Sequence, residues 1–99
     1  MDITFSIAGV PIRLTAERWF HIVENHDDLA GYYNDVLETV ENPELIIPGN
    51  KGSLIAVRSY GHRRYLAVIY RERSSEDGFI VTAYFTEQID RKKALWKLT

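Results

Sequence analysis

The spacing of apolar residues changes twice along this chain. These two changes restrict the possible folds more than any other feature of the sequence. Residues 3–7 and 10–14 alternate apolar and polar side chains, which is the period of a half-buried strand, and Ala8-Gly9 supplies a turn between them. From Thr15 to Asn42 the spacing becomes helical, and from Glu44 onward it returns to strand-like segments. We therefore predict a β-hairpin, then two helices, then further strands.

Capping residues and apolar stripes define the two helices. Thr15 is a good N-cap for the first helix, whose apolar stripe includes His26. Asp27 or Asp28 can cap the second helix, which ends at Asn42-Pro43. The apolar positions of the second helix are Leu29, Tyr32, Tyr33, Val36, Leu37 and Val40.

The second half of the chain contains four predicted strands. They cover residues 44–47, 54–60, 65–71 and 79–86, separated by turn-forming residues, and the tail from Asp90 to Leu98 is predicted to be a short helix. The predicted fold class is α+β: an N-terminal β-hairpin, two helices, then a four-stranded antiparallel sheet with the helices packed on one face. Residues 1–99 form a single domain in this interpretation.

Pairing the last two strands about a turn near Ser75 assigns residues to faces. The uniformly apolar set, predicted to face the helices, is Ala67, Ile69, Phe79, Val81, Ala83 and Phe85. The mixed set, predicted to form an open platform or a plain solvated face, is Leu66, Val68, Tyr70, Ile80, Thr82, Tyr84 and Thr86. The predicted core is Trp19, Ile22, Val36, Leu37, Val40, Ile69, Val81 and Phe85. The sequence leaves the face of Arg58 undecided.

Composition excludes several classes of protein. The chain has no cysteine, which removes disulfides and cysteine-based metal sites, and its three histidines (His21, His26 and His62) show no metal-binding spacing. We predict no metal and no cofactor. Neither a signal peptide nor an apolar run long enough for a membrane span is present, so a cytoplasmic protein without membrane contact is expected.

Charge is separated along the chain. Residues 17–44 carry eight acidic residues and one basic residue, whereas residues 51–73 carry six basic residues and one acidic residue. Such separation creates a basic face on a weakly acidic protein and favours an anionic partner, although solvated strand edges produce the same pattern. The candidate nucleic-acid-binding residues are Lys51, Arg63, Arg64, Arg71 and Arg73.

Metal-free cleavage of RNA is the chemistry that suits these residues best. It needs a base for the 2′-hydroxyl proton, an acid for the leaving oxygen, and cations for the charge that develops on phosphorus. Histidine suits proton transfer near neutral pH, and arginine suits the anionic transition state. The candidate catalytic residues are His21, His26, Arg58, Thr82 and Tyr84. Arg71 is an alternative to Arg58 as the strand cation.

Several segments resemble a known group of nuclease-like domains. They are residues 13–26, with histidines spaced His-x4-His, residues 36–43, ending in Asn-Pro, and residues 65–71 and 78–86, the last with a Thr-x-Tyr strand. Over roughly residues 12–90 the chain resembles small phage and bacterial domains of the barnase/EndoU/colicin/RelE-like superfamily. The resemblance implies helices ahead of a curved four-stranded antiparallel sheet and metal-independent RNA cleavage on the open sheet face. It points to His21, His26, Thr82 and Tyr84.

Three functions follow as hypotheses. The first is a small metal-independent ribonuclease or toxin-like RNase domain that acts on RNA. The second is a non-enzymatic interaction module that binds a protein partner or forms a homodimer, suggested by the acidic helices. The third is a non-catalytic nucleic-acid binder. Convergence of the candidate catalytic residues in one groove would favour the first hypothesis, and their dispersal would favour the second.

Overall fold

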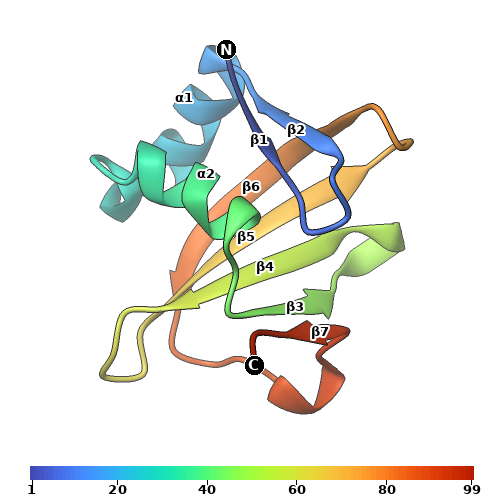
Figure 1. Ribbon diagram of the computed structural model, residues 1–99. Coiled ribbons are helices and arrows are strands. Elements are labelled where there is room, and N and C mark those ends of the chain that lie inside the picture. Colours follow the sequence, from blue (N-terminus) through green and yellow to red (C-terminus); the bar gives the residue numbers. More distant parts are fainter.

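The computed structural model describes residues 1–99 and contains one mixed, curled sheet of seven strands. The strands are β1 (Asp2–Phe5), β2 (Pro11–Leu14), β3 (Leu45–Pro48), β4 (Leu54–Ser59), β5 (Tyr65–Glu72), β6 (Gly78–Thr86) and β7 (Trp96–Lys97). The helices are α1 (Ala16–Asn25) and α2 (Tyr33–Glu41), with three short 3-10 helices, η1 (Asp27–Leu29), η2 (Asn50–Gly52) and η3 (Arg91–Lys93). The order across the sheet is β1-β2-β6-β5-β4-β3-β7 (Figure 1).

The predicted fold class is therefore wrong in its sheet. The N-terminal hairpin does not stand apart from a four-stranded antiparallel sheet, because β2 pairs in parallel with the start of β6. Gly78 permits this close approach: a Cβ there would lie 2.4 Å from the carbonyl oxygen of Arg71 and 2.5 Å from Cδ1 of Ile12. Arg13 closes the junction with two hydrogen bonds to the Asp77 carboxylate, at 3.0 and 3.1 Å.

The C-terminal tail is a second correction. The predicted helix over residues 90–98 is instead the short η3 turn followed by strand β7, which pairs antiparallel with β3. The N–H of Leu95 donates to the carbonyl of Ile46, and the N–H of Leu98 donates to that of Glu44. Hydrogen bonding to the open edge of β3 thus stabilises the tail more than its weak helical propensity would.

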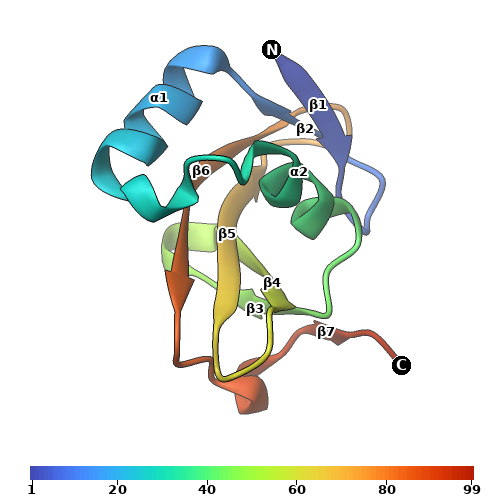
Figure 2. The same ribbon diagram turned by 90° about the vertical axis from the view of Figure 1, so that its left-hand side faces the viewer.

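The two helices lie on the same side of the sheet, and the sheet curls around α2 (Figure 2). The Thr15 hydroxyl caps α1 by accepting from the N–H of Arg18 at 3.1 Å, as predicted. The second helix begins at Tyr33, later than predicted, because Gly31 adopts a left-handed φ of 90° after the η1 turn. We call the sheet face covered by the helices the inner face and the opposite face the outer face.

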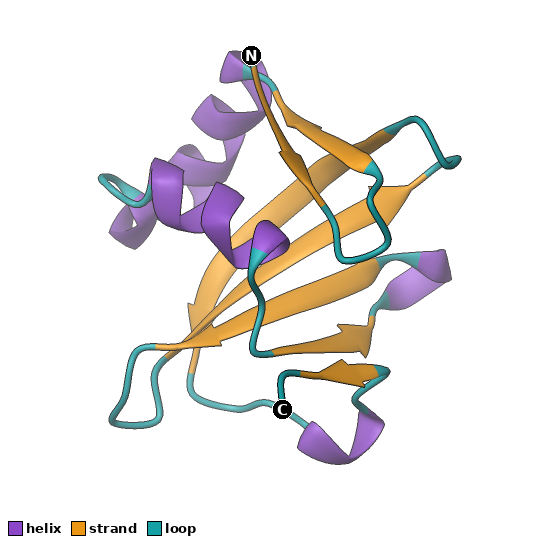
Figure 3. Ribbon diagram, in the orientation of Figure 1, coloured by secondary structure: helices purple, strands orange, loops and turns teal.

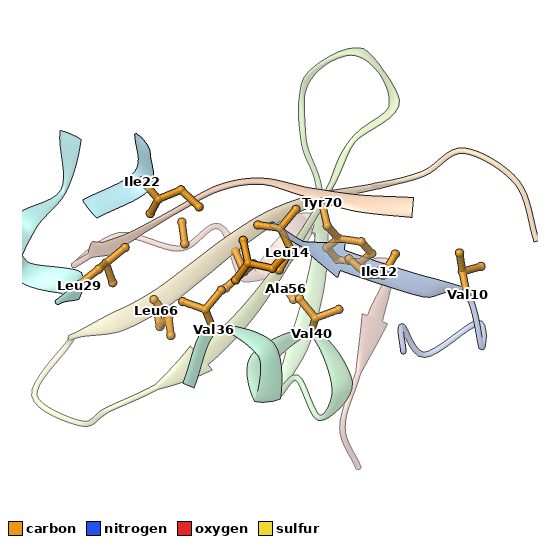
Figure 4. Close-up of a cluster of buried hydrophobic side chains, with 13 residues drawn as sticks. Val10, Ile12, Leu14, Ile22, Leu29, Val36, Val40, Ala56, Leu66 and Tyr70 are labelled. Carbon is orange, nitrogen blue, oxygen red and sulfur yellow. The ribbon is translucent and has the colours of Figure 1, made fainter. Parts of the chain in front are cut away.

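The core fills the space between α2, α1 and the inner face (Figure 4). It consists of Val10, Ile12, Leu14, Ile22, Leu29, Val36, Val40, Ala56, Leu66, Val68, Tyr70, Ile80 and Ala83. Among the predicted core residues, Ile22, Val36 and Val40 are buried, and Trp19, Leu37 and Phe85 pack against the cluster. Ile69 and Val81 do not belong to it, so their assignment was wrong.

A β-bulge explains the wrong assignment. In the β5–β6 ladder Ile69 pairs with Thr82, whereas its neighbour Tyr70 pairs with Ile80, which leaves Val81 as an extra residue. The extra residue lets Ile80 and Ala83, three positions apart, both face the core. Leu66, Val68 and Tyr70 of β5 and Ile80 of β6, predicted for the open face, therefore face the core. After the bulge, Ala83 and Phe85 lie on the predicted side.

Candidate anion-binding groove

The outer face of β4, β5 and β6 carries a groove of about 570 Å³. Its apolar floor consists of Ile55, Ile69 and Val81, one from each strand. The loop between β3 and β4 forms one wall, and Lys93 of η3 closes part of another. A groove of this size accommodates a small ligand or roughly one nucleotide of a longer chain.

The rim of this groove is positively charged. Lys51, Arg71 and Lys93 line it, and no Asp or Glu does so. Lys51 and Arg71 take part in no salt bridge, and Lys93 lies 4.0 Å from the Asp90 carboxylate, at the limit of an ion pair. Three cations without a lining acid on a chain of net charge −2 create a local positive potential that attracts anions.

The β3–β4 loop holds Lys51 in an uncommon conformation, within η2, the short purple helix between β3 and β4 at the right of Figure 3. Lys51 has a φ of 53°, in the left-handed region that a side chain with a Cβ seldom adopts. The Ser53 hydroxyl donates to the carbonyl of Asn50 at 2.8 Å, and the N–H of Gly49 donates to that of Ser53 at 2.9 Å. The closed loop therefore fixes the backbone that presents the Lys51 ammonium group.

Tyr84 joins the groove to the first helix. The bulge places Val81 and Tyr84 on the outer face together, although three positions separate them. His26, the residue that ends α1, lies with its ring centroid 6.0 Å from that of Tyr84, in an edge-to-face arrangement. Of the candidate catalytic residues, His26 and Tyr84 are the two that the structure brings together in this way.

The other candidate catalytic residues lie elsewhere. The exposed His21 ring is 3.7 Å from the carboxylate of Glu24, one helical turn away. Arg58 lies 3.6 Å from Glu38 of α2, which settles its position on the helix side of the sheet. Thr82 pairs with Ile69 and so lies on the outer face beside the groove, but it does not line the groove.

The basic residues predicted to bind nucleic acid divide into three places. Lys51 and Arg71 line the groove. Arg63 and Arg64 belong to the β4–β5 turn, where the Arg64 guanidinium lies 3.9 Å from the centre of the Phe85 ring. Arg73 lies 3.5 Å from the Asp77 carboxylate at the far end of β5.

Sequence reasoning missed Lys93 as a groove residue. The basic character of residues 91–93 is plain in the sequence, but a predicted helix at the tail gave no reason to place them beside β4. After β6 the chain passes β5 and β4 in the sheet order and pairs with β3 as β7, and η3, which precedes β7, lies beside the outer-face groove. Only this long-range path brings Lys93 to Lys51 and Arg71.

Three tyrosines have raised pKa values, and none lines the groove. Burial raises the pKa of Tyr33 to about 12, helped by the hydrogen bond from its hydroxyl to Asp2. Burial likewise raises the pKa of Tyr60, whose hydroxyl donates to Asp35, and that of Tyr70 in the core. These hydroxyls stay protonated near neutral pH and support the fold.

No protein-family model, curated protein or solved structure matches this chain, so the groove is interpreted from its own residues. The resemblance to the nuclease superfamily remains a prediction. None of the helices has both the length and the apolar character needed to cross a membrane.

Proposed function

We propose that the outer-face groove binds single-stranded RNA through its phosphate backbone. The observation that carries this proposal is the set of three cations, Lys51, Arg71 and Lys93, around an apolar floor without any lining acid. The phosphate groups of RNA neutralise these cations. The counterions condensed on the RNA are released on binding, which drives association at low salt. RNA as the partner agrees with the cytoplasmic location expected from the sequence.

A single strand fits this groove better than a duplex. Tyr84 offers an aromatic face beside the floor formed by Ile55, Ile69 and Val81. An unpaired base exposes apolar surface that can stack on an aromatic ring, which contributes on the order of 1–3 kcal/mol per base. A duplex hides its bases, so it would use the cations and leave the floor empty.

Titration of a fluorescently labelled single-stranded RNA, followed by anisotropy, tests the proposal. Arg71→Ala should weaken binding about tenfold and lower the slope of log K against log salt by about 0.7, one phosphate contact on a single strand. Arg73→Ala is the matched control, because Arg73 is two residues away in sequence but is paired with Asp77. Its affinity should stay within about twofold of wild type.

A second variant separates binding from folding. Lys51→Gly removes the cation and also relieves the left-handed strain at this position, so it should bind RNA more weakly while unfolding at an equal or higher temperature. Equal affinities of the Arg71→Ala and Arg73→Ala variants, or RNA binding that is indifferent to salt, would contradict the proposal. Preference for a duplex would contradict the role given to Tyr84.

Metal-independent cleavage of the bound RNA is the second candidate function. The observation that favours it is the contact between His26 and Tyr84, which puts a proton-transfer group next to a groove residue. In the reaction, His26 would take the proton from the ribose 2′-hydroxyl as that oxygen attacks the adjacent phosphorus. The bond from phosphorus to the 5′-oxygen breaks, and this oxygen takes a proton from water, which leaves a 2′,3′-cyclic phosphate and a 5′-hydroxyl. Arg71, rather than the paired Arg58, would stabilise the charge on phosphorus.

Cleavage in the presence of EDTA, with identification of the cyclic phosphate, tests this second candidate. His26→Gln should abolish cleavage while RNA binding persists, and His21→Gln is the matched control, because His21 lies on the same helix and is exposed to solvent. Melting temperatures of both variants must match that of wild type. RNA that binds but stays intact, or His26→Gln with the wild-type rate, would leave binding alone as the function.

A further inference from the structure

Residues 3–7, which form most of β1 and the start of its turn, have their polar side chains inside and their apolar side chains outside. Thr4 and Ser6 are 6% and 5% exposed, whereas Ile3, Phe5 and Ile7 are 52%, 53% and 44% exposed. A strand with one face exposed to solvent usually shows the opposite pattern, with its apolar residues facing the core. Residues 3–7 therefore present an apolar stripe that nothing in this chain covers.

The inward-facing side chains leave no buried polar atom without a hydrogen-bond partner, so this reversed pattern costs no unpaired buried group. The Ser6 hydroxyl donates to the Glu72 carboxylate and accepts from the N–H of Val10 at 3.2 Å. No buried side-chain nitrogen or oxygen in the protein lacks a partner. The arrangement is thus a stable feature of the fold, and its exposed stripe calls for a partner.

The backbone of β1 is also open on one side. β1 stands at the end of the sheet order, and the N–H of Ser6 donates to the carbonyl of Val10 across the hairpin. Because antiparallel ladders alternate, the N–H and C=O groups of Ile3 and Phe5 point away from β2, toward the open edge. Natural edges are commonly guarded by lysine or proline, and residues 3–7 contain neither.

We propose that β1 pairs antiparallel with β1 of a second copy of this chain, which joins the two sheets into one. A two-fold axis at Thr4 places Ile3 opposite the partner's Phe5, and Phe5 opposite the partner's Ile3. Each of these residues has edge-facing backbone groups, so the pairs exchange main-chain hydrogen bonds. The same register keeps the apolar side chains of both copies on one face, where they pack across the strands.

Charge does not oppose pairing with a second copy. Asp2 is the only charged side chain of β1, and it accepts a hydrogen bond from the Tyr33 hydroxyl at 2.6 Å. Arg13 on the neighbouring strand is already held by Asp77. Two identical edges can therefore meet without unpaired like charges facing each other across the axis, which is the usual obstacle to self-pairing of edges.

The apolar area exposed on residues 1–7 indicates how strong the contact between two copies can be. The exposed parts of Met1, Ile3, Phe5 and Ile7 amount to roughly 400 Å² per copy, inside the range of patches that mark interaction sites. Two such stripes with their backbone edges remain below the ~1,200 Å² of a standard stable interface. We therefore expect a reversible dimer with a dissociation constant in the micromolar range.

Sedimentation equilibrium on paired charge variants tests both the dimer and its register. The double variant Ile3→Lys with Phe5→Lys places like charges opposite each other and should weaken the dimer at least about tenfold relative to wild type. Ile3→Lys with Phe5→Glu places opposite charges across the axis and should recover most of that loss. Phe20→Lys is the matched control, because Phe20 is 62% exposed but lies on α1, and it should leave the dimer unchanged.

Amide hydrogen exchange supplies an independent readout. The amides of Ile3 and Phe5 should become protected as the protein concentration rises through the dissociation constant. A protein that stays monomeric up to millimolar concentration overturns the proposal, as does a dimer whose Ile3 and Phe5 amides stay unprotected. The inference does not rest on RNA binding: Arg71→Ala should leave sedimentation unchanged whether or not it weakens RNA affinity.

Discussion

The bulge in β6 can be tested with two isoleucines of the same sheet. Ile80 is 1% exposed and faces the core, whereas Ile69 lies on the floor of the outer groove. Alanine at either position removes the same three carbon atoms. At Ile80 the lost transfer free energy is about 2.5 kcal/mol, at ~0.8 kcal/mol per methylene. An unfilled cavity in the core adds on the order of 1 kcal/mol, for a total of about 3–4 kcal/mol.

The same substitution should cost much less at Ile69. Water already reaches the groove, so Ile69→Ala leaves no sealed cavity and should cost about 1 kcal/mol. In thermal unfolding followed by circular dichroism, these values correspond to losses of roughly 20 °C for Ile80→Ala and roughly 5 °C for Ile69→Ala. An equal or larger loss for Ile69→Ala would show that the strand has no bulge and that Ile69 faces the core.

Three further predictions concern the fold. Gly78→Ala should lower the free energy of unfolding by about 2 kcal/mol or more in urea titrations, because the new Cβ collides with the Arg71 carbonyl and with Ile12. His62→Asn with Arg63→Gly should raise the melting temperature without changing RNA affinity, because His62 and Arg63 have φ values of 52° and 60° in a turn that favours Asn-Gly. Stability should fall as the pH rises from 10 toward 12: unfolded tyrosines lose their protons near pH 10, whereas Tyr33 keeps its proton up to a pKa of about 12. Urea titrations across this range should show a smaller fall for Tyr33→Phe, and an unchanged fall would exclude this contribution.

Local signals were sufficient for most elements of this fold. The alternation of residues 3–7 and 10–14 produced the hairpin, and the Thr15 cap marked the start of α1. Strands β3 to β6 lie close to their predicted ranges. Each of these features depends on a few neighbouring residues, which a sequence pattern records directly.

The largest misses involve partners distant in sequence. Parallel pairing of β2 with β6 depends on a small residue at Gly78 and on Asp77 reaching Arg13, and neither is marked in the sequence as a partner of β2. The tail became a strand because β3 offered an open edge. The bulge at Val81 lies in a run of residues that suit any register, so nothing local identifies the extra residue.

Residue type and charge predicted part of the groove. Lys51, Arg71 and Tyr84 were candidates because of their chemistry, and the fold gathers them. The histidines could not be sorted in this way. His21 and His26 are five residues apart, about 140° around a helix, so one can reach the sheet while the other faces solvent. Which of the two reaches Tyr84 depends on how α1 packs against β6.

Two of the places where local preference and the final fold conflict coincide with the proposed sites. β1 exposes its apolar side although Thr4 and Ser6 could have faced water, and Lys51 adopts a backbone conformation that a glycine would adopt at lower cost. Natural sequences are locally consistent with their folds, and the exceptions concentrate where a residue serves something beyond stability. An exposed apolar edge lowers solubility, and a lysine with a left-handed backbone conformation lowers stability. Contacts within a single chain do not explain why either feature is present. An RNA phosphate at Lys51 and a second strand at β1 would each supply that reason.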